Sequence, residues 1–403
     1  MSRSDDETAP FKTVDWDRHG GRSRRPGGRT LVLLAGAAGL AASFAHDYLF
    51  APEKPYPFSL VGWDVSRLDW LLLVAVLVGV RYGLVPALAD RDRTARCARA
   101  LLGRPAGLLS VVGIVGLTLT AFLGPDSFEL LYPRLEHRLQ PPVYTTTSTE
   151  IDYNYQCVGR VVEGRCHGSW RYPLGTNRIG ENVLELVAEG LHVAMKLGVA
   201  AGVIMVVLGV VVGATAGYVG GRVDDLLMRY VDVQQTVPAV IVYILVASLF
   251  LGEYGGIPDG GLFTLAVVFG LLDWGGVARL VRSQALQLRT TGYVRAARAA
   301  GASRLWVLRN HVVPNTTSTA LTAVTRRIPL LVLAQVALAY LELNQVSASL
   351  GRTMRAGLFG DAAWHEKWWV TTAAVVVLVV LVVSFSVFGD VLRDVLDPQT
   401  EVE

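Results

Sequence analysis

Eight long apolar stretches run through this chain of 403 residues and restrict what it can fold into. A helix needs about 20 mainly apolar residues to cross a bilayer, and the stretches approach or reach that length. Hydrophobic residues make up 52% of the chain and charged residues 18%, which is too apolar for an ordinary soluble protein. We therefore predict an all-α integral membrane protein with about eight transmembrane helices. The predicted spans cover residues 30–50, 70–89, 106–123, 193–218, 237–251, 262–281, 318–341 and 369–388.

Arginine gathers in the polar segments between these stretches, as the positive-inside rule requires of cytoplasmic loops. Eight spans then place both termini and residues 282–315 in the cytoplasm and residues 124–190 outside. Residues 1–29 are polar and rich in Gly and Arg, so we expect a disordered cytoplasmic tail followed by an uncleaved first span. The two clusters that set this orientation, before the first span and after the second, are Arg22, Arg24, Arg25, Arg29, Arg91, Arg93, Arg96, Arg99 and Arg104.

Three cysteines are too few for a metal framework of the usual spacing. Cys97 stands alone in a basic stretch. Cys157 and Cys166 share the loop predicted to lie outside, where a disulfide between them and a pair of reduced thiols are both open. The net charge of +3, without alternating basic and aromatic residues, gives no indication of nucleic-acid binding.

A basic, alanine-rich island at residues 293–314 separates two apolar stretches. It predicts two short helices joined at Gly301, where glycine permits a tight turn. In the first helix Arg295 and Arg298 share a face, and small alanines keep the helix slim enough for another protein's cleft. In the second, the spacing of Leu305, Leu308 and Val312 predicts an apolar stripe, and we expect Pro314 to end the helix.

This island resembles the cytoplasmic coupling loop of binding-protein-dependent ABC importer permeases, which has the form E-A-A, three residues, G, nine residues, I-x-L-P. Arg295 stands where the family has Glu, and His311 and Val313 replace Ile and Leu. A fuller pattern belongs to the dipeptide, oligopeptide and nickel branch. The residues that the resemblance assigns to ATPase coupling are Tyr293, Val294, Arg295, Ala296, Ala297, Gly301, Ala302, Ser303, Arg309, His311, Pro314 and Asn315.

Three further stretches are similar to motifs of the same family and occur in the family's order. They begin at Tyr172, Gly217 and Gly389. In the first, Asn177, Glu181 and Asn182 depart from the pattern, and we expect Thr176 or Asn177 to cap the next helix. In the second, Asp224 and Arg229 are able to pair at the membrane surface. The matching residues are Pro173, Leu174, Gly175, Thr176, Gly180, Gly217, Gly220, Gly221, Asp224, Arg229, Asp232, Gly389, Asp390, Arg393 and Asp394.

The resemblance covers residues 106–398 and implies a type I ABC importer permease fold, in which a six-helix core follows an added N-terminal hairpin at residues 30–105. Residues 106–190 would hold the first core helix and the outer loop, and residues 191–398 the permease domain. As Gln335 replaces a common Glu, it is either a helix-packing hydrogen bond or a ligand contact.

The resemblance further implies a non-catalytic C-type permease subunit in the prokaryotic cell membrane. Its expected partners are a homologous second permease, two ABC ATPase subunits, an extracytoplasmic solute-binding protein and membrane lipid. This chain would bind no cofactor and no metal, because ATP and Mg²⁺ would be used by the ATPase subunits; it has no G-x-x-x-x-G-K-[ST] phosphate loop. Dipeptides or oligopeptides are the expected cargo. Nickel or another small solute, a membrane-embedded enzyme and an ATP-independent carrier are the alternatives.

Overall fold

Two of the predicted apolar stretches fold into the pair of helices at the centre of the molecule. In the computed structural model, α6 (Val183–Val219) and α9 (Leu262–Arg289) make the most extensive contact between any two helices. Gly209, Gly213 and Gly217 recur every fourth residue on α6, and a Cβ atom on any of them would collide with α9. Small residues at this spacing let two membrane helices pack closely.

The structure describes residues 28–50, 59–60, 63–127, 134–149, 155–250, 261–343, 349–359 and 364–396. Six helices within these ranges are long and apolar enough to cross a membrane, or seven if one bent pair counts as a span. α1 (Gly28–Phe50) coincides with the first predicted span. The side chains at both its ends lie outside the described residues, so an eighth span stays a prediction, as does the disorder of residues 1–27.

The N-terminal elements pack on the central pair through α2 (Arg67–Gly79). Ser66 caps α2 by a reciprocal pair of hydrogen bonds with Asp69, and the other Asp69 carboxylate oxygen lies 2.8 Å from Lys196 Nζ on α6. After α2 the helix continues through a π-helical segment, η2 (Val80–Leu84), into α3 (Val85–Ala89), so Arg67–Ala89 forms one candidate span. The basic stretch after it forms a short helix, α4 (Arg91–Leu102), which the sequence did not reveal.

Two of the predicted spans are broken helices. α7 (Gly221–Thr236) and α8 (Ala239–Phe250) meet at Pro238 with a bend of 68°. The predicted span at residues 237–251 is therefore wrong as a separate crossing, because a helix of 12 residues is only about 18 Å long. α12 (Val313–Thr325) and α13 (Ile328–Tyr340) break at Arg326 and Arg327, ahead of Pro329.

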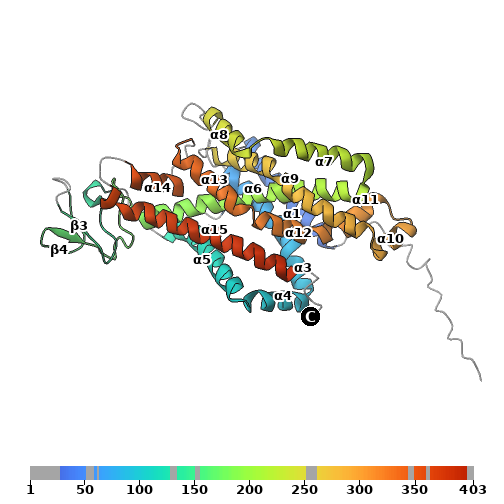
Figure 1. Ribbon diagram of the computed structural model, residues 1–403, viewed down its shortest axis with the longest axis horizontal. Coiled ribbons are helices and arrows are strands. Elements are labelled where there is room, and N and C mark those ends of the chain that lie inside the picture. Colours follow the sequence, from blue (N-terminus) through green and yellow to red (C-terminus); the bar gives the residue numbers. More distant parts are fainter. Residues whose placement is uncertain are drawn as a thin grey trace, which may run out of the picture.

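The segment between α5 (Pro105–Ser127) and α6 forms a small structure that we call the β lobe, residues 134–182. It contains η3 (Leu135–His137) and an antiparallel sheet of three strands, in which β5 (Arg165–His167) lies between β3 (Thr146–Ser148) and β4 (Val161–Val162). The lobe lies at one end of the long axis and α10 at the other (Figure 1). Its residues Cys157 and Cys166 form a disulfide.

The C-terminal elements close the bundle beside α5. α14 (Leu350–Leu358) precedes a short 3-10 turn, η6 (Trp364–Glu366), and then the long α15 (Trp368–Leu396), which packs on both α5 and α14. Near the N-terminus of the chain, β1 (Ser59–Leu60) pairs with β2 (Trp63–Asp64). The buried side chains form two clusters, one centred on α6 and α9 and the other between α5, α6 and α15.

Candidate functional site

The predicted pair of short helices follows the C-terminal end of α9. The first, α10 (Gly292–Ala299), ends in a Schellman motif. The backbone N–H of Ala302 donates to the carbonyl of Ala297 at 3.0 Å, and that of Gly301 donates to Arg298 at 3.0 Å. Gly301 has φ of +85°, a left-handed conformation that costs a residue with a side chain free energy. The predicted turn at Gly301 is thus confirmed.

The second helix differs from the prediction at its far end. α11 (Arg304–Val307) begins at Ser303, whose Oγ accepts a hydrogen bond from the N–H of Trp306 at 3.2 Å. A π-helical segment, η5 (Leu308–Val312), then leads directly into α12. The N–H of Val313 donates to the carbonyl of Leu308 five residues back, and this wider turn accommodates Pro314 without a break. The expectation that Pro314 ends the helix is therefore wrong.

Three valines hold this α10–α11 segment, residues 292–312, against the bundle. Val294, Val307 and Val312 are fully buried and belong to the cluster around α6 and α9. Leu305, which the predicted stripe placed inside, has 73% of its surface exposed. The reason is the π turn, because one extra residue shifts the buried face from the spacing expected of an α-helix.

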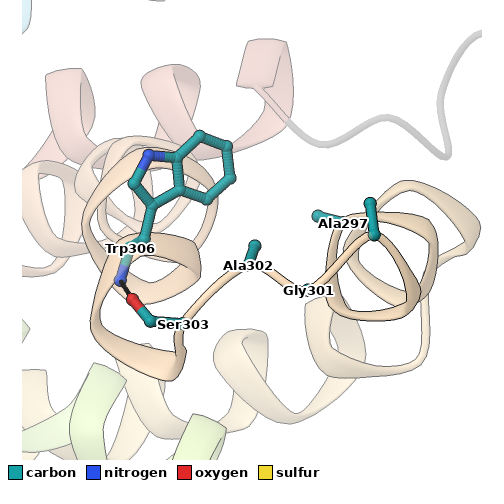
Figure 2. Close-up of a pocket in the computed structure, with 6 residues that line it drawn as sticks. Ala297, Gly301, Ala302, Ser303 and Trp306 are labelled. Carbon is teal, nitrogen blue, oxygen red and sulfur yellow. Dashed lines mark hydrogen bonds between the residues drawn. The ribbon is translucent and has the colours of Figure 1, made fainter. Parts of the chain in front are cut away.

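Between the two short helices lies an open hollow of about 400 Å³. Ala297 forms one side and the half-exposed indole of Trp306 the other, with Gly301, Ala302 and Ser303 along the floor (Figure 2). Among the described residues, no atom lies within 4 Å of a Cβ atom placed on Gly301. The arginine side chains around this hollow are exposed: Arg295, Arg298, Arg304 and Arg309.

Ring contacts and hydrogen bonds connect the remaining residues of the motif. His311 lies between two aromatic rings, with centroids 5.7 Å from Tyr293 and 5.2 Å from Trp306. Asn315 donates to the carbonyl of His311 at 2.6 Å and accepts at its own carbonyl from Gln284 on α9 at 3.1 Å. Ala296 is exposed on α10. The predicted coupling residues thus lie together in the α10–α11 segment and the first turn of α12.

The second motif forms ion pairs with α9. Arg282 binds Asp224 through both guanidinium branches, at 2.5 and 2.6 Å, and Arg279 binds Asp232 at 2.6 Å. The suggested pair of Asp224 with Arg229 is wrong. Arg229 is exposed, and residues five apart lie about 140° apart around a helix. Gly220 and Gly221 both have positive φ and make the turn between α6 and α7.

The first motif is the base of the β lobe, next to α15. Thr176 is fully buried, and its hydroxyl donates to the His137 carbonyl at 2.6 Å and accepts from the Gln140 N–H at 2.8 Å. Trp369 of α15 donates to the Thr176 carbonyl at 3.0 Å. Neither expected residue caps α6. Asn182 does so, because its side chain accepts from the N–H of Leu184.

Asn177 instead folds the chain back on itself, since its side-chain oxygen accepts from the N–H groups of Ile179 and Glu181. Gly175 and Gly180 have φ of +77° and +82°, which explains the need for glycine in this turn. The rest of the first motif is apolar: Pro173 and Leu174 continue the turn that seats the β lobe on the bundle.

The third motif joins α15 to two other elements. Asp390 lies 3.4 Å from Arg326 at the break between α12 and α13, and Asp394 lies 3.2 Å from Arg104 before α5. Gly389 is packed against the Arg326 side chain, and Arg393 is exposed. These charges therefore tie the end of α15 to its neighbours.

Sequence reasoning missed one polar cluster within the predicted spans. Asp273 lies near the middle of α9 and contacts Tyr243 of α8 and Arg327. Gln335 is fully buried, and neither atom of its amide has a hydrogen-bond partner in the described part of the chain. The helix-packing hydrogen bond suggested for Gln335 is therefore absent there.

Comparisons with known proteins agree with this geometry. A family model described as the inner membrane component of binding-protein-dependent transport systems matches residues 209–402. The dipeptide transport system permease protein DppC of Bacillus subtilis is 32% identical over 227 residues, which cover 56% of this chain and 68% of the relative.

Two oligopeptide transport system permease proteins are similarly related. OppC of Bacillus subtilis is 32% identical over 56% of this chain and 71% of its own length. OppC of Escherichia coli is 32% identical over 56% of this chain and 72% of its own length. The matched region includes α9, the α10–α11 segment and α15. The chain therefore belongs to the family of inner membrane components of binding-protein-dependent transport systems, and it is a multi-pass permease subunit of an ABC importer.

Proposed function

We propose that this permease subunit passes dipeptides or oligopeptides across the membrane and couples their passage to ATP hydrolysis through the α10–α11 segment. The observation that carries the coupling role is the shape of this segment. Its inner face is fixed by three buried valines, and its outer face presents an open hollow with an exposed leucine and tryptophan. The peptide cargo is supported by the names of the related dipeptide and oligopeptide permeases.

The packing suggests how movement would pass from an ATPase to the spans. Val294, Val307 and Val312 belong to the same buried cluster as residues of α6 and α9. Because close-packed interiors transmit displacement, a partner that grips the α10–α11 segment would shift these helices with it. The π segment η5 continues into α12 without a flexible loop, so α12 would move as well.

Charge supports an orientation with both termini in the cytoplasm. The helix α4 and the α10–α11 segment carry exposed arginines, and both lie away from the end that holds the disulfide-bonded β lobe (Figure 1). Positive charge favours the cytoplasmic side, and a disulfide persists in an oxidising compartment. The β lobe would then face the external binding protein.

The remaining partners in this proposal are a homologous second permease and two ABC ATPase subunits, which would bind ATP and Mg²⁺. The surface of α8 suits burial against the second permease or lipid, since its exposed side chains are large and apolar: Val240, Ile241, Ile244, Leu245 and Leu249. This chain would contribute the pathway and no catalytic group.

Co-purification tests the proposal. We expect the tagged chain, extracted in detergent, to retain a second permease and ATPase subunits, and the reconstituted complex to take up labelled peptide only with ATP. Trp306→Ala should weaken retention of the ATPase subunits at least tenfold, because it removes one wall of the hollow. Trp364→Ala is the matched control, since Trp364 is also exposed but lies before α15 at the other end.

Two results would contradict the proposal. Uptake by the chain alone, without ATP, would identify a carrier. ATP-dependent uptake of nickel in preference to peptides would keep the importer and replace its cargo.

A further inference from the structure

Two broken helices meet near the middle of α9. The bend between α7 and α8 places Tyr243 beside Asp273, and the Tyr243 hydroxyl donates to one carboxylate oxygen. The break between α12 and α13 places Arg327 on the other side, with Nη1 at 3.8 Å from the second carboxylate oxygen. Ionisable groups inside membrane spans and interruptions of their helices both mark the paths of transported solutes.

Arg327 differs from the arginine next to it. Arg326 points to α15, where it pairs with Asp390 at 3.4 Å. Within the described part of the chain, the Arg327 guanidinium forms no hydrogen bond, and its contact with Asp273 is longer than one. The Arg327 side chain is 41% exposed and that of Asp273 is 19% exposed. Arg327 therefore offers its hydrogen-bond donors to the surface of this subunit.

The guanidinium of Arg327, inside a predicted span, needs more hydrogen-bond acceptors than the described residues provide. Lipid cannot satisfy a guanidinium, so Arg327 must face water or a polar ligand. Asp273 leaves the guanidinium donors unsatisfied, because its nearest carboxylate oxygen lies 3.8 Å from Nη1 and the other oxygen accepts from Tyr243. Gly276 leaves room for the guanidinium against α9, since a Cβ atom there would lie 3.2 Å from Nη2. The guanidinium thus lies against α9 through Nη1 and Nη2, while 41% of the Arg327 side chain stays exposed.

We propose that Arg327 binds a carboxylate of the transported solute as it passes, with Asp273 and Tyr243 as positioning residues. A guanidinium presents parallel N–H donors that match the two oxygens of a carboxylate. A peptide with a free C-terminus carries such a group, and so does a peptide with an acidic side chain. The inference rests on the proposed peptide cargo and adds a residue that distinguishes among peptides.

The test compares two peptides that differ only in the C-terminal group, a free acid and its amide. Uptake of each into proteoliposomes with the complete importer is measured, and each rate is divided by the occupancy of the binding protein at that peptide concentration. We expect the wild type to prefer the acid and Arg327→Gln to lower this preference at least tenfold. Arg326→Gln is the matched control and should leave it unchanged. A third peptide, amidated but with a glutamate side chain, shows which carboxylate is bound.

Arg327→Lys keeps the charge but loses the planar fork, so we expect an intermediate preference, at least threefold below the wild type. This variant decides the question if Arg327→Gln does not assemble. Equal loss of uptake for acid and amide, or an unchanged preference in an assembled Arg327→Lys importer, would overturn the inference. Loss of the second permease from both variants would also overturn it, because Arg327 would then pair with that subunit. If the wild type takes up no peptide, the proposed cargo itself has failed.

Discussion

The β lobe is held together by contacts within itself, whereas the α10–α11 segment is held by contacts to the bundle. In the lobe, a disulfide, a buried threonine hydroxyl and a histidine–tyrosine hydrogen bond all join residues of the same 49-residue stretch, residues 134–182. In the α10–α11 segment, local hydrogen bonds terminate α10 and cap α11. The segment is held against the bundle by three valines that are buried in the neighbouring core.

This difference predicts different responses to damage. A self-contained lobe should lose its own structure and leave the bundle intact. A segment that shares the core of the bundle should stay folded when its exposed surface changes, and its defects should appear in coupling. The following substitutions test that contrast.

The largest effect should follow removal of the disulfide by the double substitution Cys157→Ser and Cys166→Ser. The bridge closes a short loop, and its loss should cost about 2.5 kcal/mol of local stability by the chain-entropy model. Hydrogen exchange of the β5 amides measures this cost, and the α10–α11 amides should not change. Cys97→Ser is the control, because Cys97 is a free cysteine in α4. Unchanged protection of β5 would show that the lobe does not depend on its bridge.

Thr176→Val should destabilise the lobe by about 2 kcal/mol. The substitution keeps the shape and leaves the His137 carbonyl and the Gln140 N–H without their buried partner. Thermal unfolding followed by the exposure of the Trp369 indole, which contacts Thr176, reports the change. Thr149→Val removes a less buried hydroxyl that donates to Gly164, and it should cost far less. Similar costs for both would contradict a special role for Thr176.

Gly301→Ala should cost about 1 kcal/mol, because alanine resists the left-handed conformation at this turn. We expect local fraying of α10, seen by hydrogen exchange, together with weaker ATPase stimulation in the assembled importer. Gly292→Ala at the start of α10 is the matched control, since a Cβ atom there meets no described residue within 4 Å and Gly292 has no positive φ. If fraying spread to the β lobe, the two ends would not be independent.

The smallest effect concerns pH and should be confined to the lobe. Burial, with a contribution from the nearby Arg171, lowers the pKa of His137 below its ordinary value of 6.5. The unfolded lobe therefore binds the proton first, so stability is complete above about pH 6.5 and falls as the pH drops below it. Protonation also makes both ring nitrogens donors, so His137 Nδ1 can then only donate in its hydrogen bond with the Tyr172 hydroxyl, 2.9 Å away. Hydrogen exchange of the lobe between pH 7 and 5 should show this, and His137→Gln should abolish the trend.

The sequence predicted what depends on local pattern. Hydropathy located the long helices, and Gly301 with its alanine neighbours located the turn between α10 and α11. The predicted coupling residues lie together in the structure because they are contiguous in the sequence. The break between α7 and α8 was missed because residues 237–251 are as apolar as a true span. No local sequence pattern indicates that the more polar helix before them forms part of the same span.

Contacts between distant residues were beyond this reasoning. Asp224 forms its ion pair with Arg282, 58 positions away, and not with Arg229 in its own helix. This pairing is determined by the packing of α7 on α9. The exposure of Leu305 was misjudged for a related reason, since a π turn leaves no clear mark in the spacing of apolar residues. Asp273 and Arg327 likewise stand 54 positions apart, and no spacing rule joins them.

The two π-helical segments, η2 and η5, have a consequence for how this chain accepts insertions and deletions. Each spans five residues and is followed by a Val-Pro pair. A π turn holds one residue more than the α-helical turn it replaces. Removing a single residue from η5 would let an ordinary helix form up to the proline, and α12 would keep nearly the same rotation relative to α11, because the π turn absorbs the extra residue. A one-residue deletion in η5 should therefore be tolerated, whereas the same deletion inside α12 should turn the rest of that helix by about 100° and change which of its side chains meet α9.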